Sequence, residues 1–147
     1  NDPKILVLDE PTEGLDPNER IRFRNLISEI AEERLVLLST HIVPDVEYVA
    51  NEILLMRDGR IVHRGTADEL IGSMTESVWK CYVGKKEVSR FVKRYKISNI
   101  KSEAQGAWLR VISDRQPLPD AVAEEATLED VFLYYFGEKA GDGDAAI

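Results

Sequence analysis

The 147-residue sequence has little cysteine, a deficit of positive charge and no long apolar run. Its single cysteine, Cys81, excludes an internal disulfide and is typical of a protein in a reducing compartment. The 19 Lys and Arg against 27 Asp and Glu give a net charge of −8, which argues against nucleic acid as a partner because binding phosphates needs clustered basic residues. No apolar run approaches the roughly 20 residues of a membrane-spanning helix, so we expect neither a secretory signal nor direct insertion into a membrane.

A short apolar run near the start of the chain, Ile5 to Leu8, is followed directly by Asp9 and Glu10. The run predicts a strand buried on both faces of a parallel sheet, and Pro11 closes it because proline cannot donate to a sheet ladder. Neighbouring residues of an extended chain point to opposite sides, so the two acids are expected to have different tasks. One could hold a metal while the other handles a proton, or both could simply mark where a core strand meets water.

Helix and strand signals follow in regular order. Asp16 is a predicted N-cap, with Pro17 in the first turn and Glu19 completing a capping box, for a helix to about residue 33. Its buried face is predicted to hold Phe23, Leu26, Ile27 and Ile30. Residues 35–38 predict a second buried strand that ends at Ser39-Thr40-His41, and a short helix is predicted from Pro44 to about Ala50. Capping alone is a sufficient explanation of Asp16.

The pattern changes further along the chain. Residues 53–56 and 60–63 flank Asp58-Gly59, a type I′ hairpin signal, and Thr66 with Glu69 forms a capping box for a helix that ends near Gly72. His63 is predicted to lie on the strand surface. From residue 73, the sequence predicts strands at 78–83, 97–101, 107–113 and 121–126 and helices at 86–95 and after Thr127. The expected core anchors are Trp79 and Trp108, and the expected solvated basic face holds Lys85, Lys86, Arg90, Lys93, Arg94 and Lys96.

Three motifs in order resemble the ATP-binding subunit of an ABC transporter. They are Leu8-Asp9-Glu10-Pro11-Thr12, Gly14-Leu15-Asp16-Pro17 and Ser39-Thr40-His41, which match the Walker B strand, the D-loop and the H-loop of that family. The likeness continues through residues 58–62 and 65–66 and, more weakly, 128–132. The sequence has no Gly-x-x-x-x-Gly-Lys-[Ser/Thr] phosphate loop and no Leu-Ser-Gly-Gly-Gln signature. The resemblance is therefore to the carboxyl-terminal portion of such a subunit.

The resemblance implies an α/β fold in two parts. Residues 1–72 are expected to form the carboxyl-terminal part of a P-loop NTPase-type parallel sheet with flanking helices. Residues 73–139 are expected to form a small α+β accessory domain, and residues 140–147 a disordered tail.

The resemblance also implies ATP hydrolysis coupled to transport, with ATP and Mg²⁺ as cofactors. By analogy with that family, the resemblance implies that Glu10 is the general base and that His41 contacts the terminal phosphate. It also implies that Asp9 orders Mg²⁺ through water. Asp16 belongs to the interface with a second ATP-binding subunit. A transmembrane permease would be the other partner, which implies a cytoplasmic location, peripheral on the inner face of the membrane. Without a phosphate loop and signature, the chain alone is expected to be inactive. In that family the strand that leads to the phosphate loop lies beside the strand at residues 35–38, so without it we expect an unpaired strand edge and self-association.

The sequence leaves two alternatives open. One is a soluble ABC ATPase of translation or DNA maintenance, which the acidic charge and the Glu13-Gly14-Leu15-Asp16 string disfavour. The other is a non-catalytic interaction module, which a comparison of ATP turnover between this chain and the full-length protein would distinguish.

Overall fold

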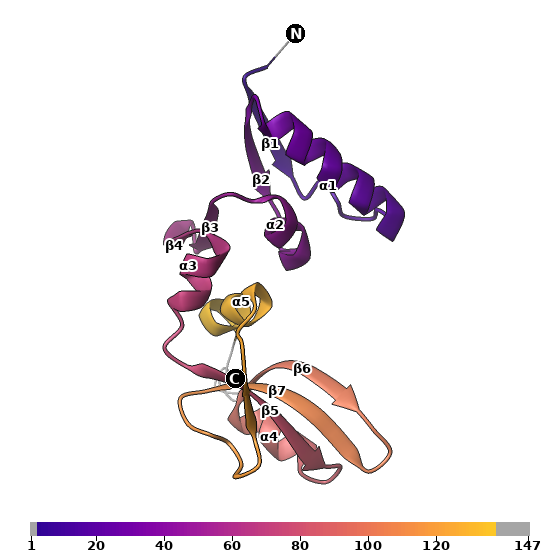
Figure 1. The fold of residues 1–147 in the computed structure, drawn as a ribbon, viewed down its shortest axis with the longest axis vertical. Helices are drawn as coiled ribbons and strands as arrows, with labels where there is room; N and C mark the ends of the chain where they lie inside the picture. The colour runs from indigo at the N-terminus through magenta and orange to yellow at the C-terminus, as the bar shows by residue number, and fades with distance from the viewer. Residues whose placement is uncertain (1–2, 138–147) are drawn as a thin grey trace, which may run out of the picture. The chain divides into compact units, whose positions relative to one another are not determined.

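The computed structural model describes residues 3–137. Within this range the chain forms two compact units, which divide between Ile53 and Leu54 (Figure 1). The predicted boundary at residue 72 stays a prediction. The predicted disordered tail, residues 140–147, lies outside the described residues. Within the described part of the chain, every helix is too short or too polar to cross a membrane.

The first unit is built around a parallel pair of strands. Strand β1 (Ile5–Asp9) is followed by helix α1 (Pro17–Ala31), strand β2 (Leu35–Ser39) and helix α2 (Val43–Val49). Parallel strands need a crossover connection, and α1 provides it. Ile5 lies opposite Leu35 and Asp9 lies opposite Ser39, so the two strands end side by side. The predicted parallel sheet with flanking helices is confirmed.

The prediction that residues 5–8 are buried on both faces is wrong, and so is the prediction that residues 35–38 form a buried strand. Burial alternates along β1 and β2, and one face is exposed at Ile5 (59%), Val7 (66%), Leu35 (64%) and Leu37 (53%). The alternate side chains are half-buried, because in the described residues the packing of α1 on β2 protects one face of the pair.

Helix α1 starts as predicted and ends two residues early. Asp16 and Glu19 form the expected capping box, and Pro17 is the first helical residue. Ile27 is buried, but Leu26 is 52% exposed, so the predicted apolar face is only partly correct.

The second unit contains a hairpin and a short helix. Strands β3 (Ile53–Arg57), which begins at the boundary of the units, and β4 (Arg60–Gly65) form a two-stranded sheet. Asp58 has φ 50° and Gly59 has φ 73°, the backbone that a type I′ turn requires, so the predicted turn is confirmed. Helix α3 (Ala67–Gly72) begins at the predicted capping box.

A four-stranded antiparallel sheet forms the rest of the second unit. Its order is β6-β7-β5-β8, and two helices accompany it. The elements are β5 (Ser77–Gly84), α4 (Val88–Arg94), β6 (Lys96–Ser102), β7 (Gly106–Ser113), β8 (Val122–Glu124) and α5 (Leu128–Phe136). Its buried core consists of Cys81, Val83, Phe91, Ala107, Leu109, Val111 and Ala121. The predicted small α+β arrangement is confirmed.

The large side chains of this unit depart from prediction in several places. Trp79 is half-buried against the core, and its indole N–H donates to the carbonyl of Ser113 at 3.2 Å. Trp108 is 37% exposed, so its prediction as a core anchor is wrong. His63 is half-buried rather than on the surface, with its ring centroid 5.6 Å from that of Tyr135.

Candidate active site

Glu10 lies in a strained backbone position directly after β1. Its φ of 44° falls in the left-handed region, which non-glycine residues rarely adopt and which costs about 1–3 kcal/mol. The backbone N–H of Glu10 donates to the carbonyl of Ser39 at 2.8 Å, so the residue stays beside the end of β2. Strain of this kind persists where the surrounding contacts fix it, and it concentrates at functional sites.

The segment after β2 holds the Glu10 carboxylate through both oxygens. Oε1 accepts the backbone N–H of His41 at 3.0 Å and lies 2.9 Å from Nδ1 of the His41 ring. Oε2 accepts the hydroxyl of Thr40 at 2.9 Å. The Glu10 side chain is 30% exposed and that of His41 is 69% exposed, so water and ligands can reach the pair.

Each member of the pair shifts the pKa of the other. The hydrogen bond from His41 lowers the pKa of Glu10 below its ordinary value, and the Thr40 hydroxyl adds to the effect. The same hydrogen bond and the negative charge of Glu10 raise the pKa of His41, with a further contribution from Glu13. The site therefore combines an ionised carboxylate with an imidazole that keeps its proton to a higher pH.

The other two predicted site residues lie apart from this pair. Asp9 is exposed, and its carboxylate accepts a hydrogen bond from the hydroxyl of Ser39. Asp16 is exposed at the start of α1, where it accepts the backbone N–H of Glu19 at 2.8 Å. Asp9 thus contacts Ser39 at the end of β2, while Glu10 contacts Thr40 and His41, which follow that strand.

The acidic residues provide little metal coordination by themselves. In residues 3–137, no group of three His, Cys, Asp or Glu side chains could hold a metal ion. Mg²⁺ usually keeps several waters and uses one or two protein carboxylates together with substrate phosphates. The single exposed carboxylate of Asp9 fits that limited role.

The first unit also contains a buried polar cluster that no sequence motif predicts. Thr12 (2% exposed) donates its hydroxyl to the carboxylate of Asp45 (1% exposed). Arg24 on α1 donates from Nε to the same carboxylate at 2.8 Å, and Arg20 approaches it to 3.6 Å. Burial alone would raise the pKa of Asp45, but these hydrogen bonds hold it below its ordinary value.

The cluster joins the turn after β1 to both helices of the first unit. Thr12 belongs to the first motif, and Asp45 lies in the first turn of α2. The two residues are 33 positions apart, so neither local pattern indicates that they meet.

The parallel strand pair with its helical crossover defines a partial NTPase-like α/β domain. No family model matches the chain. The chain is 31% identical over 97% of its length to the Nod factor export ATP-binding protein I of Burkholderia lata, covering 50% of that protein. It is 33% identical over 74% of its length to an uncharacterized ABC transporter ATP-binding protein of Nostoc sp., covering 31% of it.

A further relative is the energy-coupling factor transporter ATP-binding protein EcfA2 of Staphylococcus epidermidis, 35% identical over 51% of this chain and 27% of the relative. These homologues are ABC transporter ATP-binding proteins, and the chain is similar to part of an ABC ATPase domain. It spans half or less of the length of each of these three relatives.

Proposed function

We propose that this chain supplies part of the ATP-hydrolysing site of an ABC transporter subunit, with Glu10 as general base. The observation that carries the proposal is the Glu10 carboxylate, which lies at a strained strand end and is held by Thr40 and His41 at 2.9–3.0 Å. The names of the relatives support ATP binding and a role in transport.

Hydrolysis of ATP requires a positioned water and a group that accepts its proton. Glu10 is suited to this because its lowered pKa keeps it ionised at neutral pH. His41 is suited to contact the terminal phosphate, because its ring is exposed and its raised pKa favours the form with a donor on both nitrogens. Asp9 would hold Mg²⁺ through water, and that ion would neutralise phosphate charge.

We further propose two protein partners. Asp16 is exposed beside α1 and would lie at the interface with a second ATP-binding subunit. A transmembrane permease would be the other partner and would hold the protein at the inner face of the membrane. The relatives' names, which contain "export" and "transporter", support this arrangement.

The substitution Glu10→Gln tests the catalytic role in a complete ATP-binding protein that contains this chain. Loss of a general base lowers the rate about 10²–10⁴-fold, so we expect turnover to fall by that factor while ATP binding is kept. Glu33→Gln removes the same charge from an exposed acid just beyond α1 and should leave turnover unchanged. If the Glu10→Gln protein hydrolyses ATP at the wild-type rate, Glu10 is not the base.

A further inference from the structure

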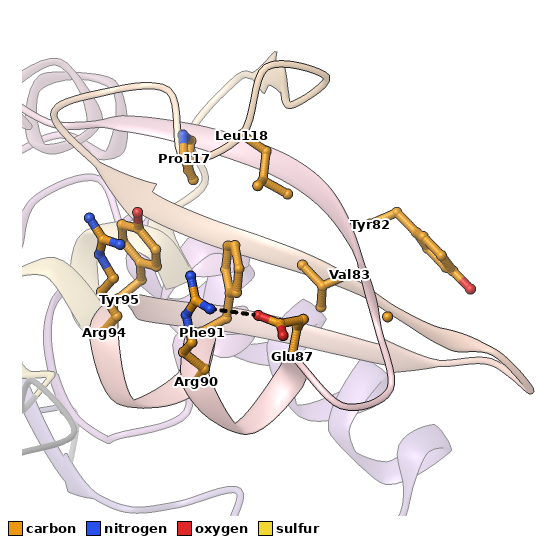
Figure 2. Close-up of a pocket in the computed structure, with 10 residues that line it drawn as sticks. Tyr82, Val83, Glu87, Arg90, Phe91, Arg94, Tyr95, Pro117 and Leu118 are labelled. Atoms are coloured by element: carbon orange, nitrogen blue, oxygen red, sulfur yellow. Dashed lines mark ion pairs between the residues drawn. The ribbon is translucent and has the colours of Figure 1, made fainter.

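A small cavity opens in the second unit between α4, the end of β5 and the loop that carries Leu118 (Figure 2). Its volume is about 260 Å³. Val83 and Phe91, both less than 10% exposed, form its apolar floor, and the half-buried Leu118 lies across from them. Nothing in the ATP-hydrolysis proposal uses this cavity.

Two guanidinium groups line the rim of the cavity. Arg90 and Arg94 lie one turn apart on α4, and both are exposed. Arg90 forms an ion pair with Glu87 at 3.2 Å, which Figure 2 shows at the rim. Arg94 lies over the ring of Tyr95, 5.2 Å from its centroid, and forms no ion pair with any residue of the range 3–137. The rim therefore carries two positive charges and one negative charge.

The charge of the surrounding segment strengthens this imbalance. Residues 85–96 contain six basic residues and one acid, a net charge of +5 within a chain of net charge −8. A positive segment in an otherwise acidic protein attracts anions to its own surface. This basic segment lines one side of the cavity, and the floor of the cavity is apolar. An anion with an apolar body therefore fits the cavity better than a fully hydrated ion.

We propose that this cavity binds a small monocarboxylate with an aromatic or aliphatic body. The body would cover Phe91 and Leu118, and the carboxylate would pair with Arg94, whose planar fork matches carboxylate geometry. One unmatched positive charge at the rim favours a monoanion over a dianion. The cavity is smaller than the roughly 300–1,000 Å³ of sites for drug-sized ligands, so the ligand is about the size of 3-phenylpropionate.

Titration of the whole chain with 3-phenylpropionate, followed by heteronuclear NMR, tests the site. We expect saturable shifts of the amides of Val83, Phe91 and Leu118. Two probes separate the contributions, because 3-phenylpropan-1-ol has the body without the charge and acetate has the charge without the body. The alcohol should bind about fivefold more weakly, the factor for one exposed ion pair of about 1 kcal/mol. Acetate should bind at least as weakly as the alcohol, because it loses the burial of the apolar body.

Two matched substitutions on α4 complete the test. Arg94→Gln should weaken binding of 3-phenylpropionate about fivefold. Lys93→Gln removes the same charge from the neighbouring position, which does not line the cavity, and should change the affinity less than about twofold. Unchanged amide positions outside the cavity show that both variants keep their fold. The proposal is overturned if 3-phenylpropionate gives no saturable shift, if the alcohol binds equally well, or if the two substitutions weaken binding equally.

Discussion

At the scale of single residues, the register of one strand pair accounts for the contacts of both motif acids. Asp9 lies opposite Ser39 in the parallel ladder, and its carboxylate accepts the hydroxyl of that residue. Glu10 is the next residue, and its left-handed backbone carries its carboxylate to Thr40 and His41. A shift of register by one residue would separate both pairs, because successive side chains point to opposite faces. The strain at Glu10 is therefore tied to the pairing of the strands.

The buried carboxylate of Asp45 should stabilise the first unit. Asp45→Asn keeps the shape but removes the charge that pairs with Arg24, so we expect the free energy of unfolding to fall by about 2–3 kcal/mol. Trp79 and Trp108 lie in the second unit, so amide hydrogen exchange at Ile27 is the better measurement. Asp58→Asn is the control, because the Asp58 side chain is 92% exposed.

This effect should also depend on pH. The pKa of Asp45 is lower in the folded state than its ordinary value, so its stabilisation is present above that value and is lost as the pH falls through the folded value. We expect the difference between the wild type and Asp45→Asn to be complete at neutral pH and to shrink below about pH 4. A difference that stays constant on acidification would assign the effect to packing instead of charge.

At the scale of elements, one arginine joins the sheet of the second unit to the start of α5. Arg110 on β7 donates to the carboxylate of Asp130, with Nη2 at 2.7 Å, and it also contacts Glu124. Asp130 is fully buried and in turn accepts the backbone N–H of Thr127 at 2.8 Å, which caps the helix. Burial would raise the pKa of Asp130, but these hydrogen bonds, that of Arg110 foremost, hold it below its ordinary value.

Arg110→Met should therefore strongly destabilise the second unit. The substitution leaves the Asp130 charge buried without its cation, which costs about 3 kcal/mol in comparable cases. The loss in the free energy of unfolding is measured by urea denaturation, followed by the fluorescence of Trp79 and Trp108. Arg115→Met, at a side chain that is 91% exposed, should change stability by less than about 0.5 kcal/mol.

A second substitution separates charge from packing at this position. Asp130→Asn in the Arg110→Met background removes the uncompensated charge while the amide can still cap α5, so it should recover part of the loss. A double variant that is less stable than Arg110→Met would contradict this explanation.

Local signals in the sequence were sufficient to predict most elements. Asp16, Thr66 and the Asp58-Gly59 turn each act through neighbours within a few residues, and all three are confirmed. Predictions of burial failed where contacts with distant segments decide which side chains are covered. An apolar run such as residues 5–8 does not show how many of its faces are covered, and Trp108 does not show which side of its strand meets the core.

The same limit applies to the candidate site. The motifs place Glu10 and His41 at the ends of two strands, and the structure brings them to hydrogen-bond distance. The pairing of Thr12 with Asp45, and the hollow beside Arg94, depend on contacts between segments that no motif connects.

At the scale of the whole molecule, the first unit exposes an unusual apolar surface. Ile5 lies opposite Leu35 and Val7 lies opposite Leu37, and all four side chains are more than half exposed. In the described residues, β1 and β2 pair only with each other, so each strand also has one edge without a neighbour. An apolar sheet face with open edges is a site for association with another chain.

We therefore expect this 147-residue chain to self-associate, with the larger species favoured as its concentration rises in sedimentation velocity. Leu37→Lys places a charge in the centre of the exposed face and should shift the chain toward the monomer, because burying an unpaired ammonium is costly. Ile21→Lys is a matched control, since Ile21 on α1 is 52% exposed and Leu37 is 53% exposed. Such a dimer need not resemble the one proposed for ATP hydrolysis. A chain that stays monomeric at high concentration, with the amides of Val36 and Leu38 exchanging as slowly as those of residues 5–8, would contradict this expectation.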